Sequence, residues 1–580
     1  MSPRLSPFLM EVVKNALDAI ADELAIVVMR TAFSTIVRDA IDYSTAICDA
    51  EGRTLAQGLT TPLHLGSFHD AMANLVPAQR NSVQPGDVFV FNDPYLAAGQ
   101  HLPDIYVVRP IYVGDSIEGW ATTLAHHNDV GGIVPGSNSI GSTEIFQEGL
   151  RLPVLKLVSA GVENDSVWKI IAANVRLPDK VIGDIRAQVA ACDRAEREFK
   201  LLFERYGASL MRECFVALHN YSERSARSAF REIPDGIYRF SNHIDGLGTV
   251  PRPIALHVAI TVAGDNVIVD WTGTSPQVNA GINAPIPHTK AASYAALRSI
   301  VGSETPNAQG FIRPIRVIAP PGTIVNPLPP AACGARGITG FRMIDCMMGA
   351  LAQAVPDRVA ADGSGGATLP SIAGVHDGKP FIFVETQMGV SGGTSGHDGQ
   401  EGVAHLGANQ SNVPIEIIEA EYPLRVEHYG FVADTGGPGR FRGGLAIVRE
   451  FRLLASEASL TVRSDKRRFR PFGLAGGHAG TPSSNAINAG SDGEEQLPVL
   501  TMTPHMMKQG DRYQHVMASG GGYGNPLERT PAHVCRDVLL GKVSVEHARR
   551  TYGVVIIGDE CEPGVDEVAT RILREQRGGK

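Results

Sequence analysis

Glycine is the feature that most constrains how this 580-residue chain can fold. It accounts for 63 residues, roughly one in nine, against a usual ~7%, and proline adds another 37. Chains rich in both residues are often disordered, but disordered chains lack apolar residues, whereas 43% of this chain is apolar. No apolar run approaches the ~20 residues of a membrane span. The glycines therefore indicate many shaped turns in a folded protein, and they are densest between Gly363 and Gly444.

Charge and cysteine content narrow the class of protein. The net charge is −9, and no basic run is longer than Lys466-Arg467-Arg468, so the electrostatic footprint of nucleic-acid binding is missing. The seven cysteines are widely spaced and form no C-x-x-C pair, which argues against zinc ribbons and disulfide scaffolds. Glu11 and Asp18 interrupt the apolar N-terminal segment, which predicts an amphipathic helix and not a signal peptide. We expect a cytoplasmic protein with no membrane and no nucleic acid as partner.

Apolar periodicity predicts a mixed α/β, multidomain fold. We expect an N-terminal α+β region that bears a metal (residues 1–232), a β-rich and glycine-rich middle region (233–525) and a small C-terminal helical tail (526–580). A first helix capped by Ser6, with Pro7 in its first turn, should end before Asp39. Further strands are expected at 43–48, 54–56, 88–91, 105–113, 120–125, 154–158, 254–262 and 266–271, and further helices at 180–231 (broken near Gly207), 289–302, 342–355, 531–540 and 543–552.

The most informative stretch surrounds residue 100. His101 and Asp104 form an H-x-x-D pair directly before one expected strand, and His126 ends the next one. If the two strands form a hairpin about Gly114-Asp115-Ser116, counting places Asp104 opposite His127, and brings His101 and His126 to the same open end. Two imidazoles and a carboxylate on rigid strand ends are typical of a catalytic divalent site, because they leave coordination positions open. Zinc, manganese or iron would suit these ligands.

Other interpretations of these polar residues stay open. They are also suited to capping strand ends and to bonding loops. Asp42 is a candidate fourth metal ligand, although a turn or cap role fits it equally well. His127 and Asp129 are candidates for orienting the ligating rings. His64 and His69 have suitable chemistry, but nothing in the sequence places them.

Two other motifs lack the context that their chemistry needs. The chain has no G-x-x-x-x-G-K-[ST], so we do not expect it to bind ATP through a P-loop. Ser391 lies in a G-x-S-x-G string, but the glycine-rich residues after it cannot supply the helix of a nucleophile elbow. The basic segment Arg463–Arg468 is expected to be a solvated loop or a subunit contact.

A series of motifs along the chain resembles the hydantoinase B/oxoprolinase family. The motifs are PLHLG, GDVFVFNDPY, GQHLPDI, HHNDVGG, EGLRLPVLKL, IPDGIY and GGPGRFRGGLAIVREFR, followed by the closing GGGYGNPLERTPAHVCRDVLL. They cover nearly the whole chain. The family includes small (B) subunits of ATP-dependent hydantoin and lactam hydrolases, one half of 5-oxoprolinase, and subunits of acetone and acetophenone carboxylases.

The resemblance implies an activity that needs a partner. An A-type subunit of the hydantoinase A family would bind ATP and magnesium and phosphorylate the substrate oxygen, in a hetero-oligomer such as a heterotetramer. This chain would then open a hydantoin, 5-oxoproline or lactam ring at one divalent metal. The metal-binding positions of the acetone carboxylase relatives match His101, Asp104 and His126. A ketone carboxylase subunit that uses bicarbonate and a non-catalytic scaffold for the A-type subunit are the alternatives, and the general base is not identified.

Overall fold

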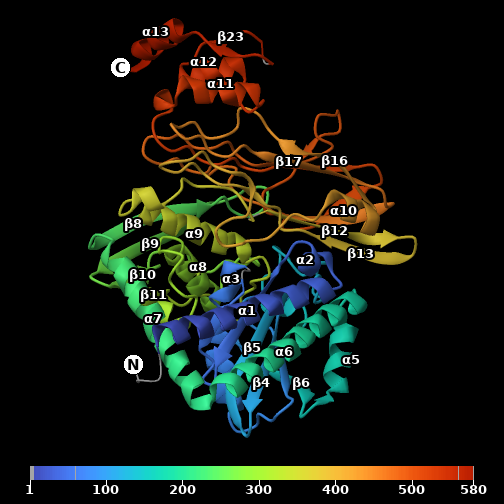
Figure 1. Cartoon of the computed structure of the whole chain (residues 1–580). Helices are drawn as coiled ribbons and strands as arrows, with labels where there is room; N and C mark the ends of the chain where they lie inside the picture. Colours follow the sequence, from blue (N-terminus) through green and yellow to red (C-terminus); the bar gives the residue numbers. More distant parts are fainter. Residues whose placement is uncertain (1–5, 59–60, 367, 560, 579–580) are drawn as a thin grey trace.

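A computed structural model describes residues 6–58, 61–366, 368–559 and 561–578 of the chain. The fold is mixed α/β and multidomain, as expected (Figure 1). An N-terminal sheet with its helices lies at one end, further sheets lie in the middle, and the small C-terminal tail lies at the other end (Figure 1). Residues 1–5, the first part of the segment expected to form an amphipathic helix, are outside the described residues. No helix in the described ranges is long and apolar enough to cross a membrane.

A seven-stranded antiparallel sheet forms the N-terminal part, in the order β2-β1-β5-β4-β3-β6-β7. Its strands are β1 (Tyr43–Asp49), β2 (Thr54–Gln57), β3 (Val88–Phe91), β4 (Asp104–Val113), β5 (Ser116–His126), β6 (Leu155–Ser159) and β7 (Val162–Glu163). Its helices are α1 (Pro7–Thr31), α2 (Thr35–Arg38), α3 (Pro62–Leu65), α4 (Phe68–Gln79), η1 (Ile145–Gln147), α5 (Asp165–Asn174), α6 (Pro178–Tyr206) and α7 (Ala208–Arg231). Ser6 caps α1 by accepting a hydrogen bond from the Leu9 amide.

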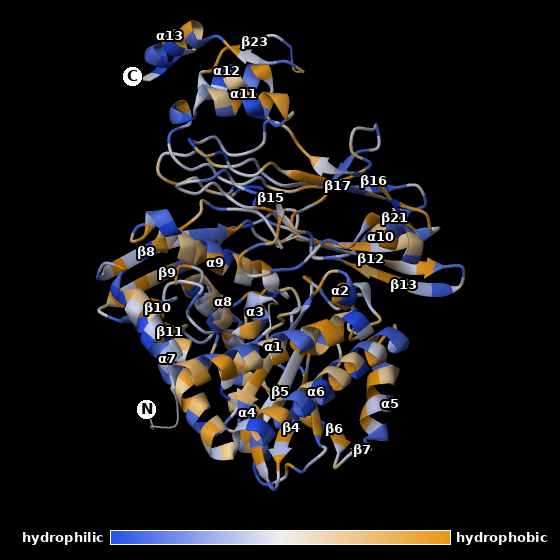
Figure 2. Ribbon diagram, in the orientation of Figure 1, coloured by the Kyte–Doolittle hydropathy of each residue, from blue (hydrophilic) through white to orange (hydrophobic). Residues whose placement is uncertain are grey.

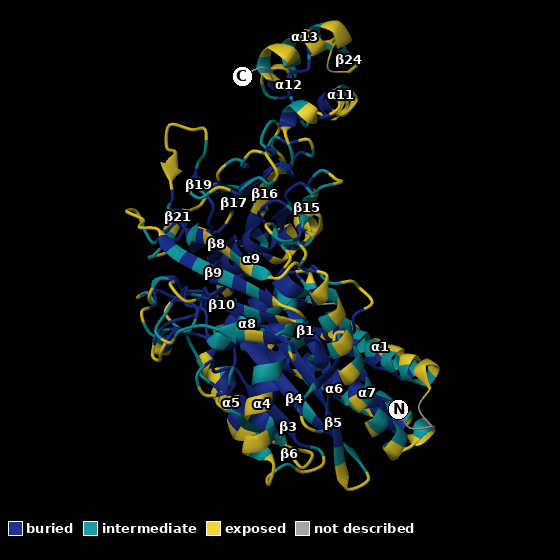
Figure 3. Cartoon of the chain, turned by 90° about the vertical axis from the view of Figure 1, so that its left-hand side faces the viewer, coloured by how far each residue is buried: buried dark blue, intermediate teal, exposed yellow. Residues whose placement is uncertain are grey.

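Both faces of this sheet are buried. Alternate residues along a strand therefore contribute apolar side chains to two different cores. Ile105 and Val107 of β4 belong to the core that includes α1 and α6, whereas Tyr106 and Val108 belong to the core beneath α4. Figure 3 shows β1, β3, β4 and β5 almost entirely buried, and Figure 2 shows apolar and polar faces on α1 and α6. Neighbouring side chains on one strand therefore belong to opposite sides of the sheet.

The next part joins a four-stranded sheet, in the order β11-β10-β9-β8, to two buried helices. Its elements are β8 (Gly236–Ile244), β9 (Ile254–Ala263), β10 (Asn266–Asp270), α8 (Ile286–Arg298), η2 (Gln309–Ile312), β11 (Ile315–Ile318), α9 (Gly337–Leu351) and η3 (Pro356–Arg358). Helix α9 packs on β8 and β9 and against α8. The predicted boundary at 232/233 falls between α7 and β8.

A four-stranded and a five-stranded sheet follow, in the orders β13-β12-β18-β21 and β16-β17-β22-β19-β20. The elements here are β12 (Leu369–His376), β13 (Lys379–Val384), β14 (Gly389–Val390), β15 (Glu401–Val403), α10 (Ile415–Glu421), β16 (Leu424–Phe431), β17 (Ile447–Leu453), β18 (Glu457–Arg463), β19 (Ser484–Ile487), β20 (Glu495–Gln496), β21 (His505–Lys508) and β22 (Arg512–Val516). Phe383 of β13 contacts Phe451 of β17, with ring centroids 5.5 Å apart, so the two sheets share one core.

Glycine-rich segments pack backbone against backbone between these sheets and the tail. Gly437 donates a hydrogen bond to the Gly520 carbonyl, Gly520 donates to Gly444, and Gly393 donates to Gly521. A Cβ on Gly443 would lie 2.0 Å from the Gly520 oxygen. These glycines are therefore needed because the chain approaches itself closely at these positions.

The C-terminal tail is small and separate. It contains η4 (Pro526–Glu528), α11 (Pro531–Leu539), α12 (Val545–Tyr552), the strand pair β23 (Ile556–Ile557) and β24 (Gly564–Val565), and α13 (Glu567–Gly578). A core cluster that includes Val534, Val538 and Tyr552 holds it together. Helices α4, α5 and α13 were not expected from the sequence, whereas α6 and α7 meet at Gly207 as expected.

Candidate metal centre

The β4–β5 hairpin brings the predicted ligands together, in a register that differs by one residue from the expected one. Asp104 lies opposite His126 and not opposite His127. The hairpin turn is tighter than expected, because Val113 pairs with Ser116, and this turn alone would place Asp104 opposite Ala125. A β-bulge between Ile111 and Tyr112, which leaves Glu118 as an extra residue on β5, moves the partner of Asp104 on to His126. Asp104 and His126 consequently belong to the same face of the sheet.

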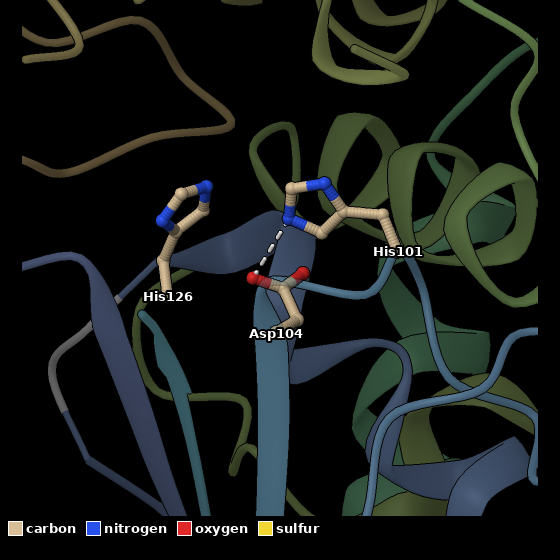
Figure 4. Close-up of side chains that lie close together, drawn as sticks. All are labelled: His101, Asp104 and His126. Atoms are coloured by element: carbon tan, nitrogen blue, oxygen red, sulfur yellow. Dashed lines mark ion pairs between the residues drawn. The ribbon is translucent and has the colours of Figure 1, made fainter. Parts of the chain in front are cut away.

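His101, Asp104 and His126 form one compact buried group (Figure 4). Each residue offers one ligand atom, and these atoms all lie within 4.8 Å of one another. The two imidazole centroids are 5.0 Å apart, and His101 Nε2 is 3.1 Å from Asp104 Oδ1. No other group of this kind with three or more members occurs in the part of the chain that the structure describes.

The contact between His101 and Asp104 is close, but it is not a hydrogen bond. His101 Nδ1 is 2.8 Å from the Gly334 carbonyl oxygen, which only accepts, so Nδ1 carries the proton of the neutral ring. Nε2 then presents a lone pair 3.1 Å from a carboxylate oxygen, and neither atom has a hydrogen-bond partner among the described residues. Two buried lone pairs at this distance repel unless a cation lies between them, so these atoms suit a divalent metal.

Electrostatics keep the group in the ligating protonation state. Burial lowers the pKa of His101, to which the charge of Arg336 contributes, and burial lowers the pKa of His126 well below its usual value. Burial opposes ionisation of Asp104, but the Arg336 guanidinium and the neighbouring imidazoles outweigh it and hold the pKa of that carboxyl well below its usual range. Neutral imidazoles and an ionised carboxylate are the forms that bind a metal.

Residues more than 200 positions away orient these ligands. Arg336, directly before α9, pairs with Asp104 Oδ2 and donates to Gln100 Oε1 at 3.0 Å. Glu148 accepts hydrogen bonds from the Cys333 and Gly334 amides, at 3.0 and 2.5 Å, and so holds the loop whose carbonyl fixes the His101 ring. Partners of this kind set the tautomer and direction of a ligating imidazole.

Asp42 and His64 lie at the edge of the group. The Asp42 carbonyl accepts a hydrogen bond from the His126 amide, which ties the two residues together. His64 Nε2 is 3.6 Å from Asp42 Oδ1 and 3.7 Å from Asp104 Oδ1. Burial and then the Asp104 charge raise the pKa of Asp42 to about 7, and burial lowers the pKa of His64 to about 4. Asp42 is therefore near the three ligands but outside their compact group, and His64, which the sequence could not place, is beside it.

His127 and Asp129 do not orient the rings. His127 belongs to the opposite face of the sheet, where its Nε2 is 3.1 Å from Gln188 Oε1 of α6. Asp129 accepts from the Gly131 and Gly136 amides and pairs with Arg176. The contacts of these two side chains are therefore with other groups than the rings of His101 and His126. For His127 the reason is that side chains alternate along a strand and the register differs by one residue.

Other residues singled out in the sequence lie elsewhere. His69 is hydrogen-bonded to Gln309 and lines a separate cavity. No helix follows Ser391 before α10, over residues that the structure describes throughout. The expectation of a solvated loop at 463–468 is wrong for its first four residues, because Arg463 to Lys466 are buried, and Lys466 adopts a left-handed φ of 66°.

A small cavity of about 30 Å³ adjoins the group. Asp42, His64, His126, His288, Arg336 and Arg463 are among its lining residues. This volume holds an ion or a water molecule but not an organic ring. Arg336, Arg463 and Gly337, at the N-terminus of α9, give one wall a positive character that suits an anionic group.

Comparison with known proteins identifies the family of this chain. The hydantoinase B/oxoprolinase family model matches residues 6–526. The chain belongs to this family. It is 35% identical to the B-type subunit of a putative D-/L-hydantoinase from Pseudomonas sp. (strain NS671), over 99% of this chain and 98% of the relative. It is also 30% identical to the beta chain of the caprolactamase of Pseudomonas jessenii, over 98% of this chain and 99% of that one.

Two solved structures share the fold of this chain. The crystal structure of the ATP-dependent caprolactamase from Pseudomonas jessenii superposes with a TM-score of 0.90 at 28% identity, covering 99% of this chain and 100% of that chain. A nucleotide-free acetone carboxylase superposes with a TM-score of 0.91 at 19% identity, covering 99% and 83%. The second likeness concerns the fold alone.

Proposed function

We propose that this chain is the metal-bearing B-type subunit of an ATP-dependent enzyme that opens a hydantoin, 5-oxoproline or lactam ring. The observation that carries the proposal is the lone pair of His101 Nε2 facing Asp104 Oδ1 at 3.1 Å, buried beside His126. Family membership and the names of the relatives, a hydantoinase subunit and a caprolactamase subunit, support the reaction class.

His101, Asp104 and His126 would hold the metal, with Asp42 as a fourth ligand after a small movement of its side chain. Zinc, manganese or iron fits two imidazoles and one or two carboxylates. The metal, when bound, would supply Lewis acidity and lower the pKa of a coordinated water to near 7.

The protein's own groups would orient the metal ligands and bind the substrate. Gly334 and Arg336 fix the directions of His101 and Asp104, which limits the reorganisation needed during the reaction. Arg336, Arg463 and the start of α9 would hold the anionic oxygen of an activated amide. Since the cavity is too small for a ring, only the activated oxygen of the substrate would fit in it as it stands. The substrate ring would lie outside the cavity, or the cavity would have to widen to admit it.

The activation step belongs to a partner in this proposal. An unactivated cyclic amide is a poor electrophile, and phosphorylation of its oxygen turns that oxygen into a good leaving group. The chain carries no P-loop motif, so an A-type subunit would bind ATP and magnesium. The relatives are named as subunits, which supports such a hetero-oligomer.

Elemental analysis of the complex with its A-type subunit, combined with activity, tests the proposal. We expect about one divalent metal per chain and ATP-dependent opening of at least one of δ-valerolactam, hydantoin and 5-oxoproline. His101→Ala, Asp104→Asn and His126→Ala should each lose metal and ring opening while the complex still assembles. A complex without metal, or variants that lose metal but keep full turnover, would point to the scaffold role instead.

A ketone carboxylase is the second candidate, favoured by the fold that the chain shares with acetone carboxylase. Incubation of the complex with ATP, acetone or acetophenone and ¹⁴C-bicarbonate separates the two reactions. If ¹⁴C is stably incorporated into an organic acid and no cyclic amide is opened, the chain is a subunit of a carboxylase and not of a hydrolase.

A further inference from the structure

A second, larger cavity shares helix α9 with the metal centre. It has a volume of about 380 Å³, within the size range of small-molecule sites. Asp345 and Met348 of α9 line it, whereas Phe341 of the same helix lines the metal cavity. The Phe341 ring contacts His405, which lines the larger cavity, with centroids 5.0 Å apart. Only side chains from one helix and one loop therefore separate the two cavities at this point.

Two carboxylates that line the larger cavity, Asp345 and Asp362, belong to a buried network of charges. Lys466 Nζ lies 2.6 Å from Asp362 Oδ1 and 2.8 Å from Asp345 Oδ2, and it also donates to the Gly363 carbonyl. Arg342 pairs with Asp465 behind this triad. All five side chains are less than 10% exposed. Within this network three carboxylates are thus matched by two cations, while Arg358, which also lines the cavity, pairs with Glu232 outside the network.

His405 does not supply the missing positive charge. The Gly407 amide donates to His405 Nδ1 at 3.0 Å, so this nitrogen is unprotonated. His405 Nε2, which must then carry the ring proton, donates to Asp345 Oδ1 at 2.9 Å. The ring is therefore neutral, and it occupies the remaining oxygen of Asp345.

Asp362 keeps one oxygen without a partner. Its side chain is 1% exposed and lines the cavity, and its Oδ1 is taken by Lys466, while its Oδ2 has no hydrogen-bond partner within the described residues. Burial and then the Asp345 charge raise the pKa of this carboxyl to about 6. A buried carboxylate oxygen without a partner is costly, and a cationic hydrogen-bond donor in the cavity would relieve that cost.

We propose that this cavity binds a primary alkylammonium group, with Asp362 Oδ2 accepting from the ammonium and the apolar wall of Ile344, Met348, Val390 and Phe472 enclosing the alkyl chain. Opening a lactam at its C–N bond yields an amine, which is protonated at neutral pH, whereas opening a hydantoin yields a neutral ureido group. As a site for the amino product of a lactam, the assignment rests on the proposed function. Ammonium binding itself does not.

Binding of simple probes to the intact full-length chain tests the assignment without ATP, partner or turnover. We expect n-pentylammonium to bind in isothermal titration calorimetry at pH 7.5, and pentan-1-ol, which has the same chain length but no charge, to bind at least ten times more weakly. Equal binding of the two probes, or no binding of n-pentylammonium, would overturn the assignment.

Asp362→Asn should weaken n-pentylammonium binding at least tenfold. The matched control is Asp537→Asn, since Asp537 is also buried but lines a different cavity and pairs with Arg529 and Arg442. We expect the control to bind n-pentylammonium within twofold of the unmodified chain. An unchanged affinity in Asp362→Asn would mean that the cluster is structural only. If Asp362→Asn does not fold, the comparison of ammonium with alcohol on the unmodified chain still decides.

A further pair of probes reports on the product. We expect 5-aminopentanoate to displace n-pentylammonium and 5-ureidopentanoate not to do so. Displacement by both compounds would refute the ammonium specificity. Because these measurements involve no ring opening, their failure leaves the proposed hydrolase untouched, and failure of the hydrolase assay leaves ammonium binding standing.

Discussion

Two buried histidine–aspartate pairs in the N-terminal part have the same separation and opposite character. His101 Nε2 lies 3.1 Å from Asp104 Oδ1, and His219 Nε2 lies 3.1 Å from Asp49 Oδ2. All four side chains are nearly inaccessible to solvent. The His219 contact is a hydrogen bond, whereas the His101 contact is not.

The difference arises from the groups around each pair. Asp49 also accepts from the Glu51 and Arg53 amides and from the Arg53 guanidinium, so both of its oxygens are satisfied. Around Asp104, the atoms without a hydrogen-bond partner in the described structure include His101 Nε2, Asp104 Oδ1, His126 Nδ1 and Asp42 Oδ1. Burial and distance are therefore alike in the two pairs, and what distinguishes the candidate metal centre is that several unsatisfied atoms lie close together there, whereas at the other pair only His219 Nδ1 has no partner in the described structure.

Asp104→Asn should separate the two pairs most clearly. The amide keeps the shape of the carboxylate but loses its charge, so metal content should fall below about one-tenth of an equivalent and ring opening by more than about 100-fold. Inductively coupled plasma mass spectrometry and an ATP-coupled ring-opening assay measure the two effects. His219→Ala is the matched control and should keep both. Loss of metal in the His219 variant as well would mean that the two pairs are not distinct.

Glu148→Gln tests whether the loop at Gly334 orients His101. One carboxylate oxygen is replaced by an amide nitrogen that faces a backbone N–H, so either the Cys333 or the Gly334 hydrogen bond is lost. We expect metal affinity to fall about 10- to 100-fold, which is typical for groups that orient a ligating imidazole. Competition with a fluorescent chelator measures it. Unchanged affinity would show that the His101 ring is held without this loop.

His219→Ala should lower stability and little else. It removes a hydrogen bond to a charged carboxylate, which contributes about 2 kcal/mol, while Asp49 keeps its bonds to Arg53 and the backbone. Urea unfolding of the variant should therefore show a lower midpoint with an unchanged slope. If the variant is as stable as the unmodified chain, the contact between His219 and Asp49 makes no net contribution to the free energy of unfolding.

The sequence predicts the residues of the candidate metal centre better than it predicts the groups that surround them. His101, Asp104 and His126 follow from a local hairpin, and an error of one residue in its register does not separate them. That error does reverse the side to which His127 belongs, because a one-residue shift exchanges the two faces of a strand. Nothing in the local sequence signals either the tight turn that pairs Val113 with Ser116 or the bulge at Ile111, and the two together set the register.

Long-range packing accounts for the remaining differences. Arg336 and Gly334 reach the centre from a segment more than 200 residues away, and the turn of helix that brings His64 is only four residues long. Lys466 looks solvated in the sequence because it follows a basic and polar run, but the structure surrounds it with carboxylates. The fold class, by contrast, follows from periodicity that each helix and strand carries in itself.

The smallest expected effect is a shift in the pH at which acid releases the metal, compared with a solvent-exposed histidine site. Protons compete with a metal for imidazole nitrogen, so a ligand with a lower pKa keeps its metal to lower pH. Burial lowers the pKa of both His101 and His126, and a solvent-exposed imidazole titrates near about 6.5. Metal should therefore remain bound as the pH falls through about 6.5 and be released only below it. A pH titration with a chelator in excess measures the midpoint, with a hexahistidine peptide as reference. Release at or above the midpoint of the peptide would mean that burial does not protect these nitrogens from protons.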